Sequence, residues 1–349
     1  MQLTYSSQEI LASHPYAQPH RVGAVTLHGG FDAAGDYHTP RTLNRWRAVE
    51  AWEAQVKSWG WPLVEVSPKI LGAEIYPSLA QQEMLLASGF GHILWNALTW
   101  TGMTEAKAAP LISIAIPDLQ AIIDEDLSST LTGHLGKGLL VAHGMDEAGD
   151  PATPDLGAHD VMWFAARDLA FGADAFPIPE PLEGMFRPVR REMPRLAPEV
   201  EYFIKYMMNV LMLEVRAEAF FDYCCTLFER GENFPLRREP ADLAAKLVGR
   251  IATDELIHIA YLRVFVSELR GFTFRTLDGQ PVKGAALIDP VWRKMVDWHA
   301  NFERKYAEVR REQAEAQILS APGGHREKVL RRFREMEPAH RLAHVATPA

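Results

Sequence analysis

Apolar residues recur along most of this chain at steps of three and four positions, which is the period of an amphipathic helix. Ala48, Trp52 and Val56, for example, follow one another at four-residue steps. The pattern predicts helices over residues 42–59, 69–100 with a break near Pro77, 117–146, 158–171, 198–230, 240–270, 289–317 and 325–336. The fold class is therefore predicted to be mainly α.

A few stretches depart from the helical period. Residues 22–27 form a short β-type run, and Asp278-Gly279 between two alternating runs predicts a β-hairpin. We expect this hairpin to pair with residues 22–27 in one small sheet. Residues 101–117, which contain two prolines and a glycine, predict a turn, and the proline-rich residues 174–200 predict an extended crossover strap.

One predicted helix carries a carboxylate and an imidazole in apolar surroundings. Glu255 and His258 are three residues apart, so both leave the same face of the helix, which also carries Ile251 and Phe265. An unpaired Glu and His buried there would be unfavourable by roughly several kcal/mol. A metal ion is the commonest partner for such a pair, because both groups are good ligands. Asp254 occupies the position where a zinc-protease motif requires His, which excludes that class of site.

The preceding helix holds two further carboxylates on an apolar stripe. Glu214 and Glu218 are one turn apart, and two such groups repel each other unless a cation lies between them. A turn at residues 232–240 makes the two helices an antiparallel pair, which brings residues near 215 level with residue 255. At least one of the two glutamates is therefore predicted to face Glu255 and His258.

A weaker half of the site is predicted near Glu83. A hairpin centred near residue 109 would bring Glu83 level with His134. A matching Glu is missing three residues before His134, because that position is Leu131. The missing carboxylate could come from Glu125 through a kink, from Glu147 or from another segment, or the site could hold one metal.

Each candidate also has a structural alternative. Glu255 and His258 could form a hydrogen-bonded pair at an exposed position, and the two glutamates of the preceding helix could pair with Arg216 and Arg250. A lone buried His is more often a core residue than a ligand, which weakens the assignment of His134 and, still more, that of three other histidines. These are His92, His143 and His159.

Glu218 followed by Asp254-Glu255-x-x-His258 resembles the second half of a ferritin-like di-iron carboxylate protein, most closely over residues 198–271. The resemblance implies a non-haem oxidoreductase that activates dioxygen on a small organic substrate. Its cofactor would be two irons, with a single metal or manganese as alternatives. The metal ligands would be Glu83, His134, Glu214, Glu218, Glu255 and His258. Asp254 would orient a ligand histidine, a role that depends on His134 being a ligand.

The same resemblance implies how the chain is organised. Residues 1–68 would form an arm, a strand and a helix, residues 69–271 the four-helix bundle, and residues 272–349 the hairpin and C-terminal helices. The bundle helices would be 70–100, 117–146, 198–230 and 240–270. The alternative is a ferritin-like scaffold with a degenerate or mononuclear site that serves as a binding or structural protein, as Leu131 in place of Glu suggests.

Composition narrows the class of protein further. The chain has 349 residues and a formal net charge of −9, which disfavours nucleic-acid binding. It has no secretory pattern and no apolar run long enough to cross a bilayer, so we expect a cytoplasmic protein without a membrane partner. No phosphate-binding loop, Gly-x-Ser-x-Gly turn or Cys-x-x-Cys pair is present. A homodimer is expected because such bundles commonly pair.

Overall fold

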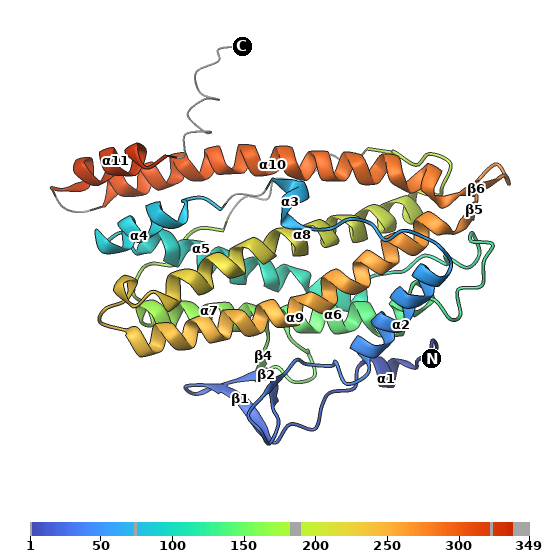
Figure 1. Cartoon of the computed structure of the whole chain (residues 1–349), viewed down its shortest axis with the longest axis horizontal. Helices are drawn as coiled ribbons and strands as arrows, with labels where there is room; N and C mark the ends of the chain where they lie inside the picture. Colours follow the sequence, from blue (N-terminus) through green and yellow to red (C-terminus); the bar gives the residue numbers. More distant parts are fainter. Residues whose placement is uncertain (1, 73–74, 182–189, 322–323, 338–349) are drawn as a thin grey trace, which may run out of the picture.

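Helices dominate the computed structural model, which describes residues 2–72, 75–181, 190–321 and 324–337 (Figure 1). The helices are α1 (Ser7–Ile10), α2 (Arg45–Ser58), α3 (Pro68–Leu71), α4 (Leu79–Ala87), α5 (His92–Glu105), η1 (Ala106–Ser113), η2 (Thr132–Lys137), α6 (Leu139–Ala148), α7 (His159–Phe171), α8 (Pro198–Glu229), η3 (Gly231–Asn233), α9 (Arg238–Gly271), α10 (Gly284–Ser320) and α11 (Arg326–Glu335). The strands are β1 (Gln18–Val22), β2 (Val25–Phe31), β3 (Tyr37–His38), β4 (Leu156–Gly157), β5 (Thr273–Arg275) and β6 (Pro281–Lys283). The prediction of a mainly helical chain is confirmed.

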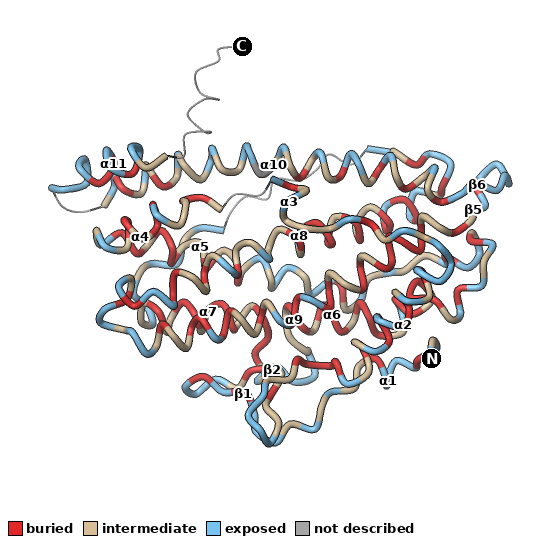
Figure 2. The backbone as a smooth tube through the Cα atoms, in the orientation of Figure 1, coloured by how far each residue is buried: buried red, intermediate tan, exposed pale blue. Residues whose placement is uncertain are grey.

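The two longest central helices, α8 and α9, form a hairpin and pack against each other. Helix α7 packs on α5 and α9, and α6 packs on the short helix η1. Figure 1 shows α10 along one edge of this group and the sheet of β1, β2 and β4 along the opposite edge. The helices therefore enclose a long interior, and their inward faces are the buried ones in Figure 2.

The apolar core of α8 and α9 is divided into two parts. One part includes Leu211 and Val215 of α8 with Ile257 of α9, and the other includes Phe221 of α8 with Ile251 of α9. Between these positions the two helices carry charged residues toward the interior. The polar cluster described below lies at this interruption.

A small sheet lies along the side of the helices opposite α10 (Figure 1). Strand β2 pairs antiparallel with β1 and β3 and parallel with β4. The hairpin predicted at Asp278-Gly279 is present as β5 and β6, but it forms its own two-stranded sheet. The predicted pairing of this hairpin with residues 22–27 is therefore wrong, because β2 already uses both of its edges for other partners.

Several predicted helices are confirmed to within a few residues, and these are 42–59, 158–171, 198–230, 240–270 and 325–336. The predicted helix 289–317 is also present, but it begins earlier, at Gly284, as part of α10. The range 69–100 is divided into α3, α4 and α5, and α5 continues into the predicted turn at 101–117. Of the predicted strap at 174–200, residues 182–189 lie outside the described residues, as does the end of the C-terminal segment, 338–349.

The predicted helix over 117–146 is wrong for most of its length. Asp118 and Asp126 accept hydrogen bonds from backbone N–H groups two or three residues ahead, which competes with helix formation. Gly138 has φ 114°, a left-handed conformation that ends η2 and precedes α6. Of the expected helix, α6 and the short 3₁₀ helix η2 remain, and the rest of the segment is irregular.

Glu268 of α9 anchors this irregular segment. Its carboxylate is fully buried and accepts hydrogen bonds from the backbone N–H groups of Leu131 and Thr132 and from the Thr132 hydroxyl. Glu268→Ala would leave three buried donors unpaired, so we expect the free energy of unfolding to fall by about 3 kcal/mol. Urea unfolding of this variant and of the control Glu239→Ala measures the effect. Glu239 is an exposed residue of the same helix. Equal midpoints for the two variants would contradict it.

Among the described residues, no helix has both the length and the apolar character that crossing a membrane requires.

Candidate metal centre

Seven carboxylate and imidazole side chains from five helices meet where the apolar core is interrupted. Helix α6 supplies two of them one turn apart, and α9 supplies two at a three-residue spacing. The others come from the end of α5, the first residue of α7 and the middle of α8. The seven residues are Glu105, His143, Glu147, His159, Glu214, Glu255 and His258.

Four of these residues form the first donor set, which consists of His143, Glu147, Glu214 and His258. His143 Nε2 lies 3.0 Å from Glu214 Oε1 and 3.5 Å from Glu147 Oε1, and His258 Nδ1 lies 3.0 Å from the same Glu147 oxygen. One donor atom from each residue lies within 4.8 Å of all the others. Ligand atoms that share one ion at bond lengths of about 2.0–2.2 Å are about 3–4 Å apart, so this set fits a metal ion.

Glu147, His159 and Glu255 form the second donor set. His159 Nδ1 lies 3.4 Å from Glu147 Oε2 and 3.0 Å from Glu255 Oε1. The second oxygen of each of these two carboxylates faces the first donor set. Glu147 Oε1 and Glu255 Oε2 both face Nδ1 of His258. The two donor sets are therefore joined by two shared carboxylates.

Each of the three imidazoles has one ring nitrogen directed at the donor sets and the other held by a residue outside them. The outer pairs are His258 Nε2 with Asp146 at 3.1 Å, His159 Nε2 with Asp254 at 3.2 Å and His143 Nδ1 with the Tyr261 hydroxyl at 2.7 Å. Such outer contacts fix the orientation of a ligand histidine and which nitrogen it offers to a metal.

The two outer aspartates are themselves held by the N-terminal part of the chain. Asp146 accepts hydrogen bonds from both Arg41 and Arg45, and Arg45 Nη2 lies 2.6 Å from Asp146 Oδ2. Asp254 accepts a hydrogen bond from the Tyr37 hydroxyl at 3.0 Å, and His28 Nε2 lies 3.4 Å away. The sheet and the residues around the start of α2 thus support the imidazoles from outside.

Among the described residues only imidazoles offset the charge of the glutamates. In spite of burial, Glu147 and Glu255 raise the pKa of His159, and Glu255 raises the pKa of His258, well above the usual range. Within the described part of the chain, no Lys or Arg pairs with Glu105, Glu147, Glu214 or Glu255. Burial and the charge of Glu147 raise the pKa of Glu105 well above its usual range, and burial and the charge of Glu255 do the same for Glu214. The region therefore favours the binding of positive charge.

Two buried atoms of the cluster have no hydrogen-bond partner, His143 Nε2 and Glu147 Oε1. Both belong to the first donor set and lie 3.5 Å apart. Buried polar atoms are normally paired, so atoms of this kind indicate a missing partner such as an ion. These buried groups could hold a metal ion.

The structure brings together three of the six ligands that the sequence analysis proposed, namely Glu214, Glu255 and His258. Asp254 contacts a histidine, but this is His159 and not His134. Glu218, one turn after Glu214, is exposed and lies outside both donor sets.

Glu83 and His134 lie away from the cluster. Glu83 forms an ion pair with Arg230 near the surface. His134 packs on Trp52, and its Nε2 accepts a hydrogen bond from the backbone N–H of Tyr5. The sequence analysis placed both residues near the other ligands because it assumed two regular helices joined by a turn near residue 109. The helices are instead interrupted before α5 and before α6, so the two residues are not level with each other.

Four residues of the cluster were missed or given little weight. Glu147 was one of several proposed sources of a carboxylate, and His143 precedes it by four residues, a spacing that places both on one helix face. His159 begins α7 and was given little weight, because a lone buried histidine is more often a core residue than a ligand. No sequence pattern pointed to Glu105 as a ligand. It is the last residue of α5, in a stretch that the sequence analysis predicted to be a turn.

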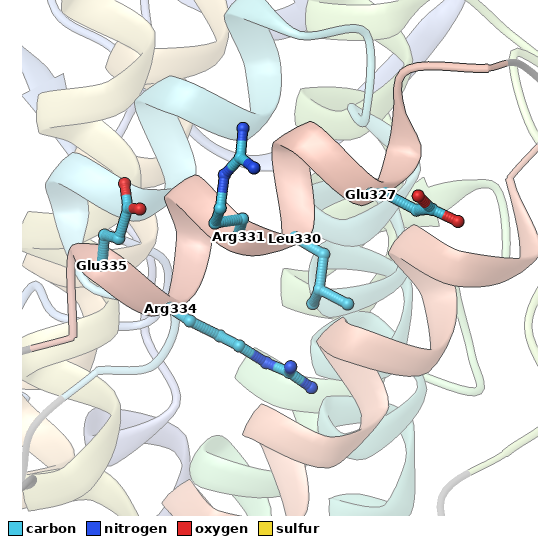
Figure 3. Close-up of a pocket in the computed structure, with 5 residues that line it drawn as sticks. All are labelled: Glu327, Leu330, Arg331, Arg334 and Glu335. Atoms are coloured by element: carbon cyan, nitrogen blue, oxygen red, sulfur yellow. The ribbon is translucent and has the colours of Figure 1, made fainter.

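The surface also has a hollow on α11, drawn in Figure 3. Its lining residues are Glu327, Leu330, Arg331, Arg334 and Glu335. Arg334 forms an ion pair with Glu315 of α10, and the lining includes neither His nor Cys. The buried cluster is therefore the better candidate for a site of chemistry.

Compared along its whole length, the chain matches no protein-family model, no curated protein and no solved structure.

Proposed function

We propose that the seven clustered side chains hold two metal ions and that the protein is a non-haem di-iron, or iron–manganese, oxidoreductase. It would use dioxygen to oxidise a small organic substrate. The observation that carries this proposal is the sharing of Glu147 and Glu255 between the two donor sets. Two ions held close together by shared carboxylates account for this arrangement better than a single ion does.

The type of donor supports iron or manganese. Four carboxylates and three imidazoles form a hard, oxygen-rich set, whereas copper and structural zinc sites use more sulfur or nitrogen. Two divalent ions would also balance the four negative charges of the glutamates. Bound iron would supply the redox chemistry with dioxygen, and the protein would supply position and electrostatics.

We further propose that α5, α6, α8 and α9 form a ferritin-like bundle. In such bundles one helix of each half gives a Glu and the next gives a Glu and a His. Glu214 of α8 with Glu255 and His258 of α9 fits one half. Glu105 of α5 with the His143 and Glu147 pair of α6 fits the other half, with the order of His and Glu reversed. His159 is an additional donor.

The surrounding residues have definite tasks in this proposal. Asp146, Asp254 and Tyr261 hold the three imidazoles so that their free nitrogens stay directed inward. The indole N–H of Trp163 donates to Glu105 Oε1 at 3.1 Å, which orients that carboxylate. The apolar cores on either side limit the entry of water. A homodimer stays a prediction.

Metal content is the first test of this proposal. Full-length protein, loaded anaerobically with ferrous iron and desalted, is expected to hold about two ions per chain. Elemental analysis measures the content, and absorption spectra before and after exposure to air show whether the iron reacts with dioxygen. About one ion per chain would favour a mononuclear site. Absence of tightly bound metal after loading would contradict the proposal.

A further inference from the structure

A third group of buried donors lies directly outside the cluster, where the small sheet meets the helices. His28 belongs to β2, His159 is the first residue of α7 and Asp254 lies on α9. His28 Nε2 lies 3.4 Å and His159 Nε2 lies 3.2 Å from the same oxygen, Oδ2 of Asp254. One donor atom from each of the three residues lies within 4.8 Å of the other two. These separations suit ligands that share one ion.

An irregularity in β2 turns His28 toward this group. Side chains of a regular strand alternate between its two faces, but Leu27 and His28 are both buried. The register of β2 against β1 shifts between Leu27 and Gly30, so His28 and Gly29 form a bulge. Gly29 has φ 70°, the left-handed conformation that favours glycine. Bulges often redirect a side chain beside a functional site, and this one directs His28 into the interior.

The pairing of β2 with β4 brings the two histidines together. Leu27 is opposite Gly157, which precedes the first residue of α7 by two positions. His28 therefore lies beside His159, and their rings meet edge to face with centroids 5.0 Å apart. Residues more than 100 positions apart in the chain are thus joined by the strand register.

Asp254 is oriented from the same sheet. The Tyr37 hydroxyl lies 3.0 Å from Asp254 Oδ2 and 3.3 Å from Oδ1. A Cβ at Gly29 would lie 2.5 Å from that hydroxyl oxygen, so the glycine of the bulge also leaves room for Tyr37. Tyr37 can donate to Oδ1 while Oδ2 binds an ion.

The imidazole of His28 points to a missing partner. Neither of its ring nitrogens makes a hydrogen bond within the part of the chain that the structure describes. His28 is 2% exposed, so bulk water does not reach these nitrogens. A buried polar group without a partner is unfavourable, and an ion bound to Nε2 would supply one.

We infer that His28, His159 and Asp254 form an outer zinc site beside the cluster. Two imidazoles and one carboxylate are a common set of protein ligands for zinc, and they leave one further position for a solvent molecule. Imidazole ligands suit zinc, and zinc binds a given donor set more tightly than ferrous iron does. The ion connects β2 to α7 and α9, so it fastens the sheet to the helices.

His159 connects the outer zinc site to the cluster. Its Nδ1 faces Glu147 and Glu255, whereas its Nε2 faces Asp254. With ions on both sides the imidazole bridges them, and the ring proton shared with Asp254 is released to solvent on binding. Without metal in the cluster, Nδ1–H can donate to Glu255 while Nε2 binds zinc. The outer zinc site therefore does not depend on the proposed function.

Zinc content tests this inference on the full-length chain. Metal-free protein is incubated with zinc chloride and desalted, and elemental analysis measures the zinc that remains. His28→Leu is expected to hold one zinc per chain fewer than the parent, because losing a direct ligand should weaken binding by at least about 100-fold. His28 belongs to neither donor set of the cluster, so ions bound there should be retained.

A histidine of the same sheet provides the control. His38→Leu, at a partly exposed position of β3, is expected to leave the zinc content unchanged. Zinc should also raise the melting temperature of the parent more than that of His28→Leu, because the ion fastens the sheet to the helices. Equal zinc content in the parent and in His28→Leu would overturn the inference.

A second variant keeps the test independent of how His28→Leu folds. Glu147→Gln combined with Glu214→Gln removes carboxylates from both donor sets of the cluster and leaves the outer ligands intact. This double variant is expected to retain about one zinc per chain, and loss of all zinc from the folded double variant would reject the outer zinc site. A zinc that depends on His28, without retained iron, would contradict only the di-iron proposal. Two irons without such a zinc would contradict only the outer zinc site.

Discussion

Glu147→Gln is expected to lower metal affinity at both positions of the cluster, by at least about 100-fold. The reason is geometric, because one oxygen of Glu147 faces His143 and His258 and the other faces His159. Glu255 also reaches toward both donor sets, but only Glu147 is a member of both. The amide has nearly the same shape but no charge, so the effect would come from ligand chemistry and not from a cavity. Elemental analysis after anaerobic iron loading measures it.

Two related variants make this prediction specific. Glu214 belongs only to the first donor set, so Glu214→Gln is expected to keep about one ion per chain. Glu218→Gln, one turn away and exposed, is the matched control and should keep the full content. Metal-free Glu147→Gln is expected to melt lower than the parent, because Glu147 is the buried carboxylate that pairs with His159 and His258. Full metal content in Glu147→Gln would contradict the model of shared ligands.

The part of the cluster that could be predicted from sequence has a local cause. Glu255 and His258 lie on one face of a long regular helix, and their spacing alone determines that they meet. Glu214 follows from the turn between α8 and α9, because a hairpin of two regular helices fixes which residues are level. Where the helices are long and unbroken, hydrophobic periodicity is therefore sufficient to predict which side chains meet. The mainly helical fold also follows from this periodicity.

The remainder depends on interruptions that periodicity does not locate. Gly138 and the aspartate turns before it shorten the predicted helix 117–146 to α6, and the shift removes His134 from the interior of the cluster. The support of the imidazoles by Asp146 and Asp254 depends on residues more than 100 positions away in the chain, such as Arg41 and Tyr37. Contacts of this kind come from tertiary packing, and no local pattern in the sequence encodes them.

Asp146→Asn is expected to lower both the stability of the protein and its affinity for metal. Asp146 is completely buried and contacts Arg41, Arg45 and His258. An asparagine must direct its NH2 group at one of these donors, and it leaves two guanidinium groups without an anion. Breaking a buried ion pair in this way lowers the free energy of unfolding by about 3–5 kcal/mol. Release of His258 should weaken metal binding by about 10–100-fold.

A double variant separates the two effects of Asp146. Arg45 is almost fully buried, and its Nε and Nη1 already lack hydrogen-bond partners, so its charge depends on Asp146. Asp146→Asn with Arg45→Met removes that uncompensated charge and is expected to recover much of the stability, because apolar groups can replace a buried pair. Metal affinity should stay low, since His258 still lacks its carboxylate. Denaturant unfolding and metal titration of both variants, with exposed Asp155→Asn as control, measure the two properties independently. Recovery of metal affinity together with stability would mean that Asp146 acts on the metal only through the fold and does not orient His258.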